Sequence, residues 1–464
     1  MIFEQHYLDC LSQASYLVGD ERTGRAVVVD PRRDVADYVA SAAEHGLRIE
    51  LVIETHFHAD FLSGHLELAA ATGAEIGVGA AGTPSFPHRP LAHGERIELG
   101  DVVLEIRATP GHTPESISVV VWDLATDPDR PYGVLTGDTL FIGDVGRPDL
   151  LASVGVSAEE LGRHLHRSLH EQLLTLPDGT RVFPGHGAGS ACGRQLSTET
   201  VSTIGEQRRS NYALADMTVE RFLEVVTEGQ PAAPGYFSYD AGLNKSDRLL
   251  FDESAPAAPL TLDEVLRLRD GGAVVLDARD GAAFAAGHLE GSVNVALDGR
   301  FAEFVGSVVR PTDTIVLVTE PGDEHEARVR LGRIGFDRVA GVLADPYGSM
   351  VERQEVVRRA SRLTAAEFLE RRRAVADLVV LDVRTHGEHQ LGSVDGAVVV
   401  PVARLGDEIE LLSAHRERPV VVFCAGGYRS SLAASLLRAH GFSDVSDVLG
   451  GYGAVAPLLS GTTT

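Results

Sequence analysis

The sequence is poor in cysteine and in lysine. Three cysteines among 464 residues cannot build a disulfide framework, which favours a reducing, cytoplasmic setting. Lysine occurs once, as Lys245, so any anion site must use arginine, helix ends or backbone amides. Long apolar runs are also missing, because stretches such as Ala397–Ala403 are far too short to cross a bilayer. No basic region followed by an apolar run opens the sequence, so we expect no signal peptide.

Positive charge is scarce as well. The 41 Lys and Arg residues face 67 Asp and Glu residues, which gives a net charge of −26, and the acidic residues are spread along the whole chain. Such a field repels nucleic acid and anionic membranes, so we expect neither as a partner. Apolar residues make up 44% and charged residues 23%, a composition that excludes a disordered chain.

The second half of the sequence contains an internal repeat. The run Val274–Arg279 recurs 105 residues later as Val379–Arg384, and Ile315–Val318 recurs at the same spacing as Val420–Phe423. Two apolar runs of strand length that share one spacing indicate a duplicated α/β unit.

The chain therefore divides into three expected domains. An α/β layered domain is expected over residues 1–250, where short apolar runs alternate with Gly- and Pro-marked turns and helical stretches. The duplicated units are expected over residues 258–355 and 360–460. Thr261 and Thr364 stand where the first helix of each copy should begin, and threonine is a good helix cap.

The sequence also predicts two further helices. One is expected over Ala158–Leu176 in the first domain, and one over Ser431–His440 in the last.

Histidine and aspartate follow the ends of four expected strands. The strand Ile49–Ile53, for example, runs directly into a histidine-rich turn, and three further strands end in Gly- or Pro-shaped turns. The residues after these strands are His56, His58, Asp60, His112, Asp138 and His186. A single histidine of this kind is more often a core or capping residue, but the cluster favours a site for a first-row divalent metal.

The run His56–Phe61 resembles the H-x-H-x-D-H signature of the metallo-β-lactamase superfamily, with Phe61 in place of the last histidine. The stretches Gly137–Asp149 and Phe183–Gly193 resemble the persulfide dioxygenase branch of that superfamily. The resemblance implies an αββα sandwich for residues 1–250. It also implies one metal and not two, because in dinuclear members the missing histidine helps to hold the second ion.

The same resemblance implies one Fe(2+) per chain, held by His56, His112 and Asp138. A set of two histidines and one carboxylate leaves three coordination positions for substrate and O2. His58, Asp60 and His186 would then orient ligands or water. Geometry alone could equally place His58 on the metal, and Zn(2+) is the alternative ion.

Two residues near this cluster are candidates for contact with the substrate. Arg147 follows the Asp138 loop, and its planar guanidinium suits a substrate carboxylate, although a solvated surface arginine is equally expected. Cys192 lies six residues after His186 in a Gly-rich turn, close enough to contact a persulfide and act in catalysis. The alternative interpretation is that Cys192 is only a small buried apolar residue.

The last domain carries a cysteine loop. Strand Val420–Phe423 leads into Cys424-Ala425-Gly426-Gly427-Tyr428-Arg429, and a helix follows. Amides turned inward and a helix N-terminus stabilise a thiolate, so Cys424 is a candidate for sulfur chemistry, with an inert buried cysteine as the alternative.

This loop and the Asp382-x-Arg384 strand end resemble rhodanese domains, in which the loop cysteine carries sulfane sulfur. The resemblance implies catalytic roles for Cys424 and Arg429 and substrate contacts from Gly426, Gly427 and Tyr428. The first copy resembles a rhodanese too, but Thr319 replaces the cysteine. A hydroxyl cannot store sulfur, so we expect that copy to serve in packing or docking.

The leading interpretation is a fused persulfide dioxygenase and sulfurtransferase of sulfide detoxification. It would oxidise a low-molecular-weight persulfide with O2 to sulfite, while Cys424 exchanges sulfane sulfur with sulfite or thiosulfate. The alternatives are a zinc thioester hydrolase of glyoxalase II type with a passenger rhodanese, and a non-catalytic sulfur carrier. Phe61 counts against the first and the complete ligand set against the second. The oligomeric state stays open, homo-oligomers included.

Overall fold

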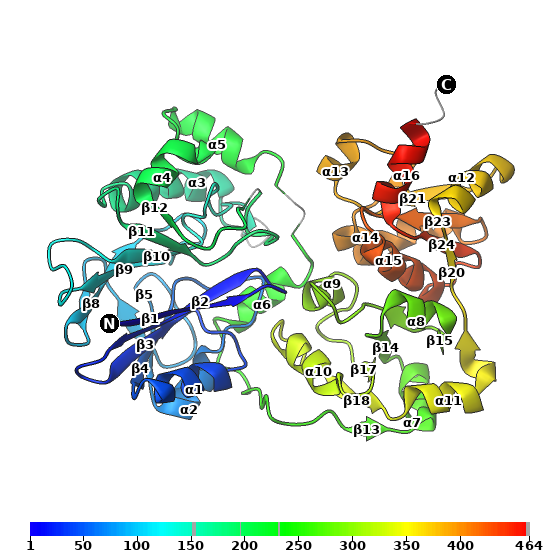
Figure 1. Cartoon of the computed structure of the whole chain (residues 1–464), viewed down its shortest axis with the longest axis horizontal. Helices are drawn as coiled ribbons and strands as arrows, with labels where there is room; N and C mark the ends of the chain where they lie inside the picture. The colour runs from blue at the N-terminus through cyan, green and yellow to red at the C-terminus, as the bar shows by residue number, and fades with distance from the viewer. Residues whose placement is uncertain (151–154, 195, 231–232, 461–464) are drawn as a thin grey trace. The chain divides into compact units, whose positions relative to one another are not determined.

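The computed structural model describes residues 1–150, 155–194, 196–230 and 233–460 (Figure 1). Over these residues the chain divides into two units. The first gathers residues 1–233, 237–253 and 332–335, and the second gathers 234–236, 254–331 and 336–464. Among the residues described, no helix combines the length and the apolar character that crossing a membrane requires.

The first unit contains two six-stranded sheets, and in each the strands lie side by side in chain order. The first sheet consists of β1 (Ile2–Leu8), β2 (Gln13–Asp20), β3 (Arg25–Val29), β4 (Arg48–Glu54), β5 (Glu75–Gly79) and β6 (Arg89–Leu91). The second consists of β7 (Arg96–Glu98), β8 (Val102–Ala108), β9 (Ile117–Asp123), β10 (Gly133–Gly137), β11 (Arg181–Pro184) and β12 (Ser202–Thr203). The helices are α1 (Ala36–Glu44), α2 (His65–Thr72), α3 (Ala158–Arg167), α4 (Ile204–Ser210), α5 (Val219–Thr227) and α6 (Phe237–Leu243).

Alternation of apolar residues along the strands explains the layers of this unit. Val29 and Ile53 of the first sheet point inward and pack with Val119 and Leu135 of the second. The next residue, Val120, points outward, into a core that α3, α4 and α5 close. The outer face of the first sheet is covered by α1 and α2. The expected αββα sandwich is confirmed.

The helix expected over Ala158–Leu176 is interrupted. α3 ends at Arg167, and a π-helical turn over Ser168–Leu173 follows it. The Ser168 hydroxyl donates a hydrogen bond to the carbonyl oxygen of Pro110, 2.7 Å away. This bond ties the widened turn to the loop that carries His112, and single π-helical turns of this kind often lie near functional sites.

The second unit contains two parallel five-stranded sheets of the same topology, with strand orders β13-β18-β17-β14-β16 and β20-β24-β23-β21-β22. The first sheet consists of β13 (Pro259–Leu260), β14 (Val274–Asp277), β16 (Val293–Asn294), β17 (Ile315–Val318) and β18 (Val339–Leu343). The second consists of β20 (Ser361–Leu363), β21 (Val379–Asp382), β22 (Val398–Val399), β23 (Val420–Phe423) and β24 (Val445–Val448). A short ladder pairs β15 (His288–Leu289) with β19 (Val357–Arg358). The helices are α7 (Leu262–Asp270), α8 (Gly281–Ala286), α9 (Phe301–Gly306), α10 (Glu324–Gly332), α11 (Pro346–Glu352), α12 (Ala365–Ala374), α13 (His386–Gln390), α14 (Val402–Glu408), α15 (Tyr428–Ala439) and α16 (Gly451–Ser460).

The duplicated α/β unit is thereby confirmed down to its helix caps. Thr261 and Thr364 each accept a hydrogen bond from a glutamate amide three residues on and complete a capping box with it. The helix expected from Ser431 begins earlier, at Tyr428. The reason is Gly427, whose φ of 103° turns the chain directly from the cysteine loop into α15.

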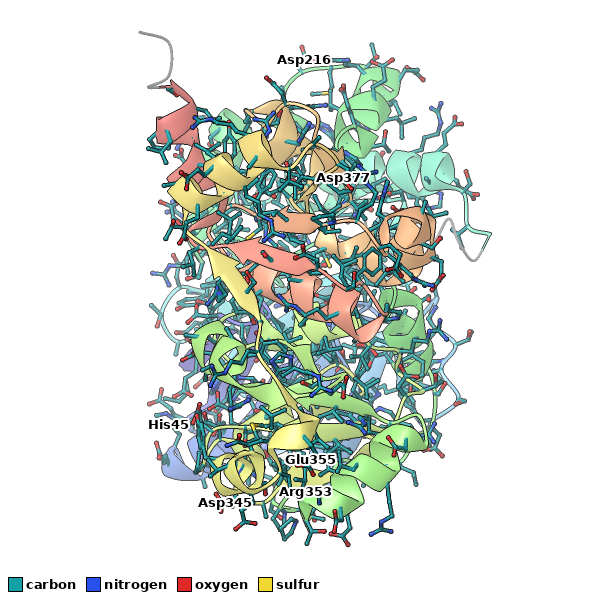
Figure 2. The ribbon with its side chains drawn as sticks, turned by 90° about the vertical axis from the view of Figure 1, so that its right-hand side faces the viewer. His45, Asp216, Asp345, Arg353, Glu355 and Asp377 are labelled. Carbon is teal, nitrogen blue, oxygen red and sulfur yellow. The ribbon has the colours of Figure 1, made fainter. Side chains whose placement is uncertain are left out.

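Acidic side chains are spread over the surface of the second unit. Asp345, Glu355 and Asp377 are exposed, and Arg353 lies beside Glu355 and donates a hydrogen bond to it (Figure 2). This distribution agrees with the acidic balance of the sequence.

Candidate functional site

Three side chains from three strand ends meet inside the first unit. His56 follows β4, His112 follows β8, and Asp138 follows β10. The Nε2 atoms of His56 and His112 lie 3.7 and 3.6 Å from Oδ2 of Asp138. One donor atom from each residue lies within 4.8 Å of the other two, and all three side chains are buried. The structure thus brings the predicted ligand set together.

Hydrogen bonds on the far side of each imidazole turn its Nε2 toward the centre. His112 donates from Nδ1 to the backbone carbonyl oxygen of Arg147, 2.9 Å away. Nδ1 of His56 lies 3.0 Å from the Thr55 hydroxyl, which donates to Asp30 and therefore accepts from His56. Both rings then present a bare Nε2 lone pair, the form in which histidine binds a metal.

The protonation states also suit a metal. Burial lowers the pKa of His56 well below its ordinary value, and it lowers the pKa of His112, so both imidazoles are neutral. Burial alone would raise the pKa of Asp138, but His186 and His56 outweigh it and hold that pKa below its usual range. Nε2 of His56 and Oδ2 of Asp138 are buried without a hydrogen-bond partner among the described residues. Two neutral imidazoles and one carboxylate with open lone pairs fit a divalent metal.

The other oxygen of Asp138 is held by His186, which follows β11. His186 donates from Nδ1 to Oδ1 of Asp138 at 2.8 Å, and its Nε2 lies 2.9 Å from Oδ2 of Asp60. Burial lowers the pKa of His186, but the two carboxylates outweigh it and raise that pKa well above its ordinary value. His186 thereby fixes the rotation of the Asp138 carboxylate and leaves Oδ2 facing the two histidines.

His58 is turned toward a second carboxylate pair. Its Nε2 lies 3.2 Å from Oδ1 of Asp30 and 3.7 Å from Oε2 of Glu54. Burial, and then Asp30, raise the pKa of Glu54 well above its ordinary value. Phe61 is fully buried against His58, with 4.3 Å between the ring centroids. His58 also lies near Asp60 and His186, so the structure gathers all six predicted His and Asp residues.

Sequence reasoning missed Asp30, Glu54 and Thr55. Each is buried beside the cluster, and Asp30 also accepts a hydrogen bond from the Thr55 amide at 2.7 Å. The signal was present, because Asp30 directly follows β3, as His56 and Asp138 follow their own strands.

Arg147 and Cys192 lie at the edge of this centre. The Arg147 guanidinium donates to both oxygens of Asp149, at 2.7 and 2.6 Å, while its amide donates to the Cys192 carbonyl oxygen. Cys192 is fully buried, and its Sγ is close enough to Asp138 and His186 to form a third group of metal-type donors. Burial raises the pKa of the Cys192 thiol well above its ordinary value, so it is protonated at neutral pH.

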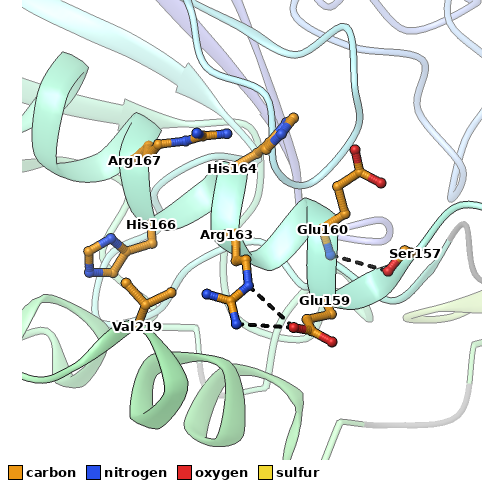
Figure 3. A pocket seen from close by; sticks show the side chains of 8 residues that line it. All are labelled: Ser157, Glu159, Glu160, Arg163, His164, His166, Arg167 and Val219. Atoms are coloured by element: carbon orange, nitrogen blue, oxygen red, sulfur yellow. Dashed lines mark hydrogen bonds and ion pairs between the residues drawn. The ribbon is translucent and has the colours of Figure 1, made fainter.

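A hollow is lined by residues of α3 and by Val219 at the start of α5. Arg163 pairs there with Glu159, and the Ser157 hydroxyl accepts from the Glu160 amide (Figure 3). Its described lining residues include none of the predicted site residues.

The cysteine loop of the second unit has the predicted form. Cys424 is almost fully buried, and its Sγ accepts a hydrogen bond from the Gly427 amide at 3.1 Å. The Cys424 thiol also lies 3.6 Å from the Ser430 hydroxyl. Gly426 is exposed at the tip of the loop. The Ser430 hydroxyl accepts from the Cys424 thiol and itself donates to the Gly427 carbonyl oxygen, so the Gly427 amide is the donor directed at sulfur. Backbone amides directed at sulfur stabilise a thiolate.

Two neighbours of this cysteine have partners elsewhere in the second unit. The Tyr428 hydroxyl donates to the carbonyl oxygen of Ala296, which belongs to the first copy. Both Nη atoms of Arg429 donate to Glu388, at 2.8 and 2.6 Å. Glu388 was not among the predicted residues, and nothing in the local sequence marks this contact.

The loop of the first copy has a different character. Thr319 is buried at the position of the cysteine, and the Gly322 amide donates to Glu324 in the same loop. Glu320 accepts hydrogen bonds from the Tyr347 hydroxyl. Acidic side chains therefore hold this loop.

Family models match both parts of the chain. A model described as the metallo-beta-lactamase superfamily matches residues 8–186, and a rhodanese-like domain model matches residues 261–345 and 364–456.

Individual proteins match as well. The chain is 31% identical over 215 residues to the mitochondrial persulfide dioxygenase ETHE1 of Bos taurus, covering 46% of this chain and 75% of that protein. It is 30% identical to the Homo sapiens protein of the same name, with the same two coverages. A crystal structure of a metallo-beta-lactamase from Staphylococcus aureus subsp. aureus COL is 34% identical, with a TM-score of 0.66, and the match covers 74% of this chain and 98% of that chain.

Proposed function

Since the chain belongs to the metallo-β-lactamase superfamily, in the family of the persulfide dioxygenase ETHE1, and carries tandem rhodanese-like domains, we propose that it oxidises a low-molecular-weight persulfide with O2 and transfers sulfane sulfur through Cys424. The observation that carries the proposal is the convergence of His56, His112 and Asp138 on one buried point with open donor atoms. We propose a cytoplasmic location, because the three cysteines are free thiols.

In this proposal His56, His112 and Asp138 would hold one Fe(2+) per chain. A two-histidine, one-carboxylate set would leave that ion able to bind a persulfide sulfur and O2. The net reaction takes one persulfide, one O2 and one water, and it gives one thiol, one sulfite and two protons.

The protein's own groups prepare that centre. The Thr55 hydroxyl fixes the orientation of the His56 ring, and the Arg147 carbonyl fixes that of the His112 ring. His186 holds Oδ1 of Asp138 so that Oδ2 stays directed inward. The Phe61 ring packs against His58, and in this proposal it stands where a ligand for a second ion would otherwise be.

Two residues are proposed to receive the substrate. We assign Cys192 to the wall of the persulfide site, where its protonated thiol adds no negative charge next to an anionic substrate. We assign Arg147 to a substrate carboxylate, which would exchange with Asp149 on the guanidinium.

At the second site, the Cys424 thiolate accepts a sulfane sulfur from a donor molecule. A new S–S bond to Cys424 forms while the bond between the sulfane sulfur and its donor breaks, and the donor leaves with the electron pair. Sulfite then accepts the sulfane sulfur, thiosulfate leaves, and the thiolate is restored. Gly426, Gly427 and Tyr428 would surround the incoming sulfur compound.

The test combines metal analysis of protein purified without added metal with O2 uptake on a persulfide prepared from a small thiol. We expect iron at about one per chain, O2 uptake, and sulfite and thiosulfate as products separated by chromatography. Two zinc ions per chain without O2 uptake would refute the dioxygenase assignment.

Cys424→Ser separates the two sites in the same assay. The variant should lose sulfur transfer from thiosulfate but keep its iron and its O2 uptake, with products shifted toward sulfite. If O2 uptake on small persulfides stops as well, sulfur must pass through Cys424 first, and the model of two independent sites fails.

A further inference from the structure

The ion pair between Glu388 and Arg429 lies beside the sulfur-transfer loop and has no assigned role. Arg429 follows Tyr428 at the start of α15, and both of its Nη atoms donate to the Glu388 carboxylate. The Glu388 side chain is 33% exposed and the Arg429 side chain is 20% exposed, so the pair lies at the protein surface but is largely covered.

The Glu388 carboxylate is itself held by hydrogen bonds from the start of its own helix, α13. It is the third residue after Thr385, whose amide and hydroxyl both donate to Oε2 of Glu388, at 2.9 and 3.1 Å. The Glu388 amide donates back to the Thr385 hydroxyl and completes a capping box. A carboxylate fixed by its own helix start is a rigid support for the arginine that it holds.

The first copy provides an internal control for this pair. Its register against the second copy is fixed by two features, since Gly322 and Gly427 both have φ near 100°, at 101° and 103°. In addition, Arg279 donates to the Gly287 carbonyl oxygen at 2.9 Å, and Arg384 donates to Gly392 at 2.8 Å.

In that register the first copy lacks the cysteine and both members of the pair. Thr319 stands for Cys424, Glu324 for Arg429, and Ala283 for Glu388. A different pair at the end of the second strand is kept in both copies. Arg279 and Arg384 each donate to the aspartate two residues before them, Asp277 and Asp382.

The fold therefore needs the Asp–Arg pair but does not need the Glu388–Arg429 pair. The latter is present where the cysteine is present and absent where threonine replaces it. Arg429 is also linked to the cysteine electrostatically. Burial lowers the pKa of Arg429, but Glu388 and then Cys424 raise it above its ordinary value.

We propose that Glu388 is a positioning residue for sulfur transfer, which holds the Arg429 guanidinium beside Cys424 so that its charge stabilises the sulfur anion there. The inference rests on the proposed sulfurtransferase function. In the half-reaction with thiosulfate, the Cys424 thiolate attacks the outer sulfur, the new S–S bond forms, and sulfite leaves with the electron pair. Negative charge lies on sulfur throughout this step. A guanidinium that is already held in place stabilises this charge most strongly, because it does not need to reorganise.

The experiment measures sulfur transfer from thiosulfate to cyanide in the full-length protein. Glu388→Gln is the main variant, because glutamine still caps α13 in a capping box but removes the charge that holds Arg429. Glu388→Ala removes both the capping side chain and the charge. As a matched control, Glu410→Gln removes one side of an exposed ion pair with Arg416 in the same domain.

We expect kcat to fall roughly tenfold or more in both Glu388 variants, with a smaller change in KM, and no change in Glu410→Gln. A second readout is the pH dependence of Cys424 alkylation by iodoacetamide, located by mass spectrometry. Its midpoint should move to higher pH when Arg429 is no longer held, which loss of a cap alone would not cause. O2 uptake on persulfide should be unchanged.

Two results would overturn the inference. If alkylation shifts to lower pH while kcat/KM for thiosulfate rises, Glu388 competes with the substrate for Arg429. If neither quantity moves, the pair is only structural. Failure of the proposed function looks different, since the wild-type protein would then transfer no sulfur and match Cys424→Ser.

Discussion

Replacing Phe61 with histidine tests why this chain should hold one metal ion. The Phe61 side chain is fully buried, and its ring centroid lies 4.3 Å from that of His58 and 6.3 Å from that of His186. An imidazole at position 61 would stand beside Asp60 and His186 and complete a second set of ligands that shares Asp138. We therefore expect Phe61→His to recruit a second ion without simply becoming a hydrolase.

The cost of the substitution can be estimated from burial. Full burial of a phenylalanine side chain is worth about 1.5–3 kcal/mol, part of which the imidazole retains. A buried imidazole nitrogen without a partner costs about 1–3 kcal/mol. We expect the first unit of the variant to be about 2–4 kcal/mol less stable than wild type in the absence of a second ion. Zinc at a hundred times its dissociation constant would restore about 2.7 kcal/mol, and the wild type should not show this gain.

The fluorescence of Trp122 allows the stability of the first unit to be measured separately. Trp122 is the single tryptophan of the chain and lies in β9, so denaturant unfolding followed by its fluorescence reports on the first unit. Metal content after dialysis against excess zinc gives the stoichiometry. Phe61→Leu is the matched control, because it keeps an apolar side chain and should stay at about one metal ion. If Phe61→His also binds only one ion and zinc does not stabilise it, the ligand argument for Phe61 is wrong.

Three further outcomes follow from the two sites. His112→Ala should lose iron and O2 uptake together while sulfur transfer survives, as metal analysis and both assays would show. Thr319→Cys should add no sulfur transfer to a Cys424→Ser background, because the acidic loop of the first copy opposes a thiolate. Burial raises the pKa of Glu388, but Arg429 outweighs it and brings that pKa to about 2 from an ordinary 4.5. The stability that this pair adds should thus be complete above about pH 4.5 and be lost as the pH falls toward 2, a loss that acid unfolding of Glu388→Gln should not show.

The convergence of the candidate metal ligands could be predicted because of where these residues stand in the sequence. His56, His112, Asp138 and His186 each follow a strand, and the strand ends that carry ligands converge at one edge of such a layered domain. The sequence therefore specified that these side chains would meet. It could not specify which nitrogen of each ring faces inward, since that depends on partners such as the Arg147 carbonyl, 35 residues from His112.

Other features depended on packing that no local pattern encodes. The Arg147 guanidinium donates to Asp149, although the sequence suggested either a clamp for a substrate carboxylate or a solvated surface arginine. The helix from Ala158 widens into a π-helical turn at Ser168, where the Ser168 hydroxyl bonds to Pro110 across the fold. In both cases the decisive partner is a polar group whose position is set by tertiary structure, and side-chain periodicity carries no information about it.

The duplicated domain separates what the fold requires from what the chemistry requires. Both copies build the same five-stranded sheet and keep the aspartate–arginine pair at the end of the second strand. They differ where the central strand ends, with Cys424 in one loop and Thr319 in the other. The same sheet topology is thus compatible with either residue at this position. We therefore propose that sulfur chemistry in this chain depends on a few residues around Cys424. The first copy still contacts that loop, because the Tyr428 hydroxyl donates to the Ala296 carbonyl oxygen. A copy that has lost its cysteine thus retains a contact to the loop of the copy that has kept it.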